Sequence, residues 1–150
     1  MTTSTQVQQD IETRVAGCVD TYADTITENY RRYHIRTLEG NLSGNYPEYA
    51  REQLDAIENG TEKLMYFKIK TGKKFYKIVQ MNFDTFQNRN EYREGSVHAF
   101  VDKKTGQVYI PASWQAPAKH VRFDLRIIKH REFLFNPDNT TWAGGYLYIR

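Results

Sequence analysis

Three side chains in the second half of the chain are of types that serve as general acids and bases in enzymes. His98 shares one face of a predicted strand with Phe100 and Asp102, and His120 shares the charged face of a later strand with Asp124. If the two faces adjoin, His98, His120 and Asp124 form the general acid/base cluster of a nuclease or other hydrolase. A solvated polar face, or a buried histidine bonded to an aspartate, explains the same pattern without catalysis.

Motifs of the common enzyme classes are missing. There is no Gly-x-Ser-x-Gly elbow, no Walker loop and no dinucleotide fingerprint. Lys-Thr-Gly occurs at 70–72 and 104–106, but without the Ser-x-x-Lys that accompanies it in penicillin-binding enzymes, and both copies fit hairpin turns. The histidines and the single Cys18 lack metal-ligand spacing. We therefore expect no metal and no cofactor, and we favour a role without catalysis.

Basic residues interleaved with rings give a stronger signal. One group lies on the first predicted hairpin, at Lys68, Lys70, Lys73, Lys74, Tyr76 and Lys77. The other, which we predict to bind the ligand, comprises Lys103, Lys104, Tyr109, Trp114, Lys119, Arg122 and Arg126. Such residues neutralise phosphate and stack on bases, so nucleic acid or a nucleotide is the expected partner. In the alternative reading, the rings are packing residues and the lysines keep strand edges unpaired.

Trp114 lies in "PASWQAPAK", between Pro111 and Pro117. Prolines fix φ, so the loop would hold the ring in place at little entropic cost. A pre-organised ring beside Lys119 and Arg122 suits a binding pocket as well as a plug over the core.

The elements that must position these residues differ in charge along the chain. Residues 1–60 hold 5 Lys/Arg and 10 Asp/Glu, a net of −5, whereas residues 61–150 hold 16 and 8, a net of +8. This asymmetry indicates either a phosphate-bearing partner for the basic part or docking of the two parts on each other.

The sequence of the acidic part predicts two helices. Apolar residues spaced by three and four predict a helix over about 6–34, with Thr5 and Gln8 as a capping box. "TLEGNLSGN" predicts a loop over 37–45, and Asn45 would cap a second helix that ends at Gly60. The long first helix would overhang the sheet, which invites self-association.

The sequence of the basic part predicts mainly strands. Alternation predicts a hairpin over 63–83 with a Thr71-Gly72 turn, a second hairpin over 96–110, and strands over 120–127 and 146–150, whereas 84–95 reads as a polar loop. We predict a single α+β domain over 1–150, with two N-terminal helices packed on a mostly antiparallel sheet of five or six strands. The chain shows no signal peptide and no stretch of 18 apolar residues, so we expect a cytosolic protein without membrane contact.

The stretches "SVHAFVDKKTGQVYIPASWQAPAKHVRFDL" and "WAGGYLYIR" resemble a family of small tailed-bacteriophage proteins over roughly residues 95–150. The resemblance implies a viral accessory or virion protein in a bacterial cytoplasm, and it transfers no catalytic residue. We expect a phage protein that binds a phosphate-bearing ligand or a host factor in host takeover or anti-defence. The alternative is a virion assembly protein that forms a homo-oligomer through its first helix, and the second alternative is the histidine hydrolase.

Overall fold

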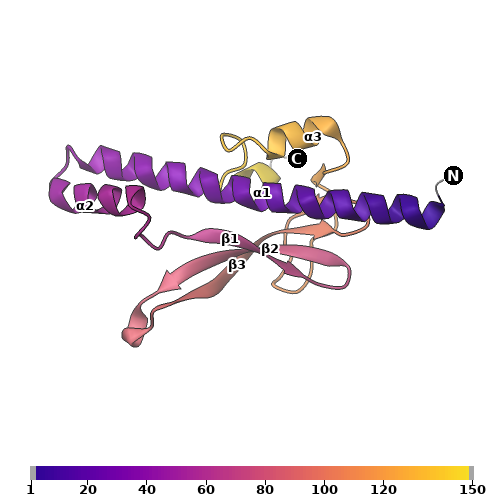
Figure 1. The fold of residues 1–150 in the computed structure, drawn as a ribbon, viewed down its shortest axis with the longest axis horizontal. Helices are drawn as coiled ribbons and strands as arrows, with labels where there is room; N and C mark the ends of the chain where they lie inside the picture. The colour runs from indigo at the N-terminus through magenta and orange to yellow at the C-terminus, as the bar shows by residue number, and fades with distance from the viewer. Residues whose placement is uncertain (1–2, 149–150) are drawn as a thin grey trace.

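A long helix lies across one face of a five-stranded antiparallel sheet in the computed structural model, which describes residues 3–148 (Figure 1). The strands follow one another in space in chain order, namely β1 (Tyr66–Thr71), β2 (Phe75–Asp84), β3 (Glu91–Asp102), β4 (Gln107–Tyr109) and β5 (Phe123–Asp124). The helices are α1 (Ser4–Asn41), α2 (Pro47–Glu58), α3 (Ile128–Leu134) and the short 3-10 helices η1 (Phe86–Asn88) and η2 (Gly145–Tyr148). The predicted α+β class is confirmed.

Helix α1 is longer than the sequence predicted at both ends. Its N-terminal capping box joins Thr3 and Gln6, two residues before the predicted pair of Thr5 and Gln8. It continues to Asn41 and so includes half of the predicted 37–45 loop. With 38 residues, it is about 57 Å long. This length carries both of its ends beyond the sheet (Figure 1).

Helix α2 folds back beside the C-terminal half of α1. Its N-cap is Tyr46 rather than the predicted Asn45, and no side chain caps it. Gly60 follows its end with a φ of 74°, as the sequence predicted, since glycine enters the left-handed region without strain. Ala50 is the fully buried residue of α2.

Half of the predicted loop over 84–95 is strand. β2 runs to Asp84 and β3 begins at Glu91, so the connection is the short η1 turn. Asp84 accepts hydrogen bonds from the Phe86 amide (2.9 Å) and from Arg89 (3.1 Å), which closes the turn. Charged residues occupy the exposed positions at this end of the hairpin. The sequence there therefore lacks the alternation of apolar and polar residues that predicts a strand packed on a core.

The predicted strand over 120–127 forms only as the two residues of β5, and α3 follows. His130 Nδ1 accepts the Asp124 amide at 2.8 Å, and Arg131 donates to the Leu125 carbonyl at 2.7 Å. These side chains of α3 take the backbone groups that a further strand would have used. The predicted strand over 146–150 is also wrong, because Gly145–Tyr148 is 3-10 helix, and residues 149–150 lie outside the described part of the chain.

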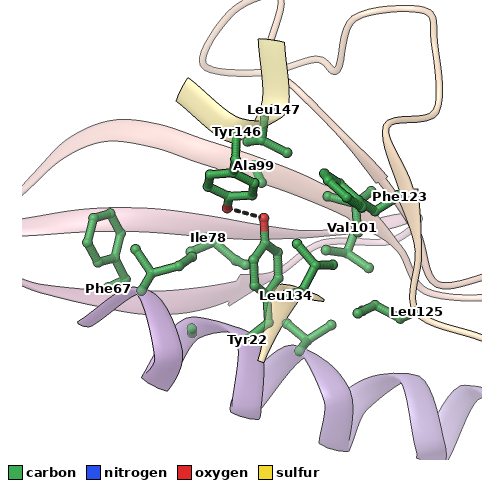
Figure 2. Packing of buried hydrophobic residues seen from close by; sticks show 14 of the residues in the cluster. Tyr22, Phe67, Ile78, Ala99, Val101, Phe123, Leu125, Leu134, Tyr146 and Leu147 are labelled. Atoms are coloured by element: carbon green, nitrogen blue, oxygen red, sulfur yellow. Dashed lines mark hydrogen bonds between the residues drawn. The ribbon is translucent and has the colours of Figure 1, made fainter. Parts of the chain in front are cut away.

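The core lies between α1, the sheet and η2 (Figure 2). Tyr22 of α1 and Tyr146 of η2 meet through their hydroxyls at 2.5 Å, and His98 Nε2 lies 2.7 Å from the Tyr146 hydroxyl. A β-bulge places His98 there, because Ile78 pairs with Ala99 and the next residue of β2 pairs with Val97. His98 therefore leaves the face shared by Phe100 and Asp102, where simple alternation had put it. Burial lowers the pKa of His98 to about 4, so the ring is neutral.

Candidate phosphate-binding surface

Four lysines surround one hollow where two hairpin turns meet. The Lys103 amide donates to the Lys74 carbonyl at 3.0 Å and its Nζ donates to the Gly72 carbonyl at 3.1 Å, which ties the β3–β4 turn to the β1–β2 turn. Gln8 of α1 donates to the Lys104 carbonyl at 3.1 Å. The hollow has a volume of about 390 Å³ and is lined by Glu12, Lys73, Lys74, Asp102, Lys103, Lys104 and Thr105.

The charge of this lysine hollow is positive. Asp102 is 8% exposed, and its carboxylate accepts the amides of Lys104 (2.8 Å) and Thr105 (3.1 Å), so it serves the turn. Glu12 supplies the other carboxylate against four ammonium groups. Among residues 3–148, none of the four lysines forms an ion pair. An anionic group such as a phosphate would meet uncompensated charge here.

A row of basic and aromatic residues crosses the sheet face that points away from α1. Lys70 pairs with Lys77, Lys77 with Phe100, and Phe100 with Tyr109, so their side chains share one face. Trp114 lies over this row, with its ring centroid 5.0 Å from Lys77 Nζ and 5.7 Å from Lys70 Nζ.

The loop that carries Trp114 is closed by its own backbone. Pro111 and Pro117 face each other as a bridge, and the amides of Ala112 and Ser113 donate to the Ala116 carbonyl at 2.9 and 3.1 Å. The ring remains 37% exposed. The closed loop therefore presents a partly exposed aromatic ring beside two lysines, a combination on which a base can stack.

Phe75 connects the hollow to the row. Lys74 Nζ lies 5.3 Å from the Phe75 ring centroid, and that ring meets Tyr109 and Phe100 edge-on at 6.1 and 5.8 Å. We name the whole surface the lysine–aromatic track, comprising Lys70, Lys73, Lys74, Phe75, Lys77, Lys103, Lys104, Tyr109 and Trp114. Its far end is partly neutralised, because Glu94 lies 2.8 Å from Lys70 and 3.3 Å from Lys68. The hydrogen bond from Lys70 is the main cause of the lowered pKa of Glu94.

The seven predicted ligand residues divide between three places. Lys103 and Lys104 line the hollow, and Tyr109 and Trp114 lie on the sheet face. The remaining predicted residues, Lys119, Arg122 and Arg126, lie on or beside the connection from β4 to β5. The lysines of the first hairpin complete the track, and the pairing of β2 with β3 brings them to it.

Arg126 is engaged by its neighbour. It binds Asp124 through Nη2 at 2.9 Å and Nε at 3.2 Å. Burial by itself would raise the pKa of Asp124, but the hydrogen bonds from the side chain and backbone of Arg126 outweigh it and lower that pKa.

No contact among the described residues joins His98, His120 and Asp124. His98 lies in the core against Tyr146, and His120 is exposed. The histidine that touches Asp124 is His130, which bonds its amide. Within residues 3–148, no three His, Cys, Asp or Glu side chains are grouped as metal ligands, and no helix is long and apolar enough to cross a membrane.

Comparison with known proteins gives one match. No curated protein and no solved structure matches the chain. A family model described as "Family of unknown function (DUF7717)" matches residues 1–149. Because the match covers nearly the whole sequence, the chain belongs to this family.

Proposed function

We propose that the protein binds single-stranded nucleic acid through the lysine–aromatic track and performs no catalysis. The observation that carries the proposal is the continuity of the four-lysine hollow with the Lys77–Trp114 face. Lysines neutralise phosphates in a salt-dependent way, and exposed rings stack on bases of any sequence.

The extent of the track favours a strand over a mononucleotide. Lys70 and Tyr109 are separated by three strand spacings, or about 14 Å. The hollow extends this surface beyond the edge of the row, so a ligand that follows it must carry several phosphates. A mononucleotide would occupy the hollow alone.

The bacteriophage resemblance gives this proposal its setting. A small viral protein that coats or redirects nucleic acid in an infected bacterium would act in host takeover or anti-defence. A role as a virion assembly protein is the second candidate, and the exposure of Val7 and Tyr33 on α1, 46% and 44%, favours it.

Fluorescence anisotropy with a labelled oligothymidine, compared with a duplex of equal length and a labelled mononucleotide, tests the proposal. The variant Lys74→Ala/Lys104→Ala removes two charges from the hollow, so the slope of log K against log salt should fall by about 1.4. Trp114→Ala should weaken binding roughly 5- to 150-fold through lost stacking.

The matched control is Lys63→Ala/Lys129→Ala, which removes two exposed charges outside the track. It should leave the salt slope at the wild-type value. Equal losses in both double variants would mean that net charge, and not the track, binds the oligonucleotide. Preference for the mononucleotide would replace a strand by a nucleotide as the ligand.

A further inference from the structure

A basic groove with an apolar floor lies between α1 and the start of α3. It has a volume of about 340 Å³, and Ile128 at its edge is 63% exposed. Arg131 donates one hydrogen bond to the Leu125 carbonyl and Arg126 binds Asp124, so both guanidinium groups keep further donors. We name this surface the arginine groove, comprising Ile11, Arg14, Cys18, Arg126, Ile128 and Arg131.

An acidic surface with exposed rings lies at the opposite end of α1. Tyr46 and Tyr49, at the start of α2, are 79% and 62% exposed, which is unusual for two neighbouring large rings. Glu48 and Glu52 lie beside them around the same shallow hollow. We name this surface the tyrosine knob, comprising Tyr46, Glu48, Tyr49 and Glu52.

The two surfaces are complementary in charge and in kind. Residues 119–131 hold five Lys/Arg and one Asp/Glu, a net of +4, whereas residues 37–60 hold one and five, a net of −4. Arginine binds carboxylates through paired N–H groups and stacks on tyrosine rings. The apolar floor of the groove would bury what the knob exposes.

The groove and the knob of one chain cannot meet each other. The groove contacts α1 around residues 11–18 and the knob follows its end at Asn41, which places them about 40 Å apart along a continuous helix. In Figure 1 the α1–α2 turn and α3 lie in different parts of the length of α1. A knob that fills the groove therefore belongs to another molecule.

We propose that the tyrosine knob of one copy docks in the arginine groove of a second copy. The contact joins two different surfaces, so it is heterologous, and each bound copy still offers one free knob and one free groove. Copies would add head to tail into a chain, or into a ring if the rotation closes.

Blocked variants test this directly in sedimentation velocity. Arg14→Glu/Ile128→Glu blocks the groove, and Tyr46→Ser/Tyr49→Ser blocks the knob. All four positions are exposed. The wild type should form a concentration-dependent series of oligomers. Each variant alone should be monomeric, with its contact weakened at least about tenfold, and circular dichroism should show an unchanged helix content.

The mixture of the two variants is the decisive sample, because it contains one intact groove and one intact knob. It should form a one-to-one dimer and nothing larger. Lys63→Glu and Tyr148→Ser make the same kinds of change at exposed positions outside both surfaces, and they should keep the wild-type series.

Three results would overturn the proposal. A wild type that stays monomeric at every concentration has no such contact. A blocked variant that keeps the series assembles through other residues. If the wild type assembles but the mixture stays monomeric, the groove and the knob do not bind each other. That result is expected if the groove binds a second groove and the knob binds a second knob.

Discussion

The buried His98 makes the stability of the fold depend on pH near neutrality. Its pKa lies at about 4 in the folded protein, against an ordinary value of 6.5, because burial disfavours the charged ring. A backbone hydrogen bond at Trp142 opposes this effect. The unfolded chain therefore binds a proton between pH 6.5 and 4 that the folded chain does not, and stability falls as the pH decreases through that range.

The magnitude follows from the two pKa values. Each pH unit between them costs about 1.4 kcal/mol, so the total loss approaches about 3.4 kcal/mol below pH 4. Between pH 7 and pH 5 the loss is about 2 kcal/mol. Asp84, Glu94 and Asp124 also have lowered pKa values. Their contribution is lost mainly below pH 5, because their ordinary pKa values are 3.8 and 4.5.

Urea unfolding at pH 7 and pH 5 measures this difference. In His98→Gln, which does not titrate, the difference between the two pH values should shrink by about 2 kcal/mol, whatever the stability of the variant at pH 7. His120→Gln, at an exposed histidine, should keep the wild-type difference. The reasoning fails if the wild type is equally stable at both pH values, or if the two variants behave alike.

Three further substitutions test how the chain is held together. Asn29→Ala removes the side chain that donates to the Pro137 carbonyl (2.6 Å) and accepts a hydrogen bond from the Trp142 amide (2.8 Å). The variant should lose roughly 2–4 kcal/mol of stability in urea unfolding. Normal protection of the Trp142 amide from hydrogen exchange in that variant would contradict this role. Gly106→Ala should lower the stability by about 2 kcal/mol, because φ is +75° and the new methyl would lie 3.2 Å from Val15. Gly17→Ala, in open space on α1, should raise the stability by about 1 kcal/mol. Equal effects of the two substitutions would refute the backbone strain assigned to Gly106.

The long helix could be predicted from the sequence because its apolar period persists over many turns, but its start could not be fixed. Thr3 with Gln6 and Thr5 with Gln8 have the same spacing, so both fit a capping box. The structure selects the first pair. Helix α3 escaped prediction because its side-chain bonds to the backbone at 124 and 125 replace a strand ladder, and such bonds leave no periodic pattern.

The types of residue in the site could be predicted from the sequence, but which of them lie together could not. The sequence analysis grouped residues of one region, such as Lys104 and Arg126, in one site. Lys74 and Lys103 lie together because hydrogen bonds to backbone carbonyls join the turns of two neighbouring hairpins. Similarly, one bulge moves His98 from a surface face into the core. A single inserted residue changes the face of a side chain, and alternation alone cannot reveal it.

The ion pairs of the fold bear on the charge asymmetry of the chain. If the acidic and basic parts neutralised each other, ion pairs would join residues 1–60 to residues 61–150. Among the described residues, one ion pair crosses that boundary, from Arg32 to Asp138 at 3.8 Å, and its polarity is the reverse of the expected one. Direct ion pairs between the two parts therefore do not account for the asymmetry in the described part of the chain. The row of the track that includes Lys77 lies on the sheet face away from α1, whereas the lysine hollow reaches Glu12 of α1. The groove and the knob are lined by other residues, so under the two proposals phosphate and a second copy of the chain would use different surfaces.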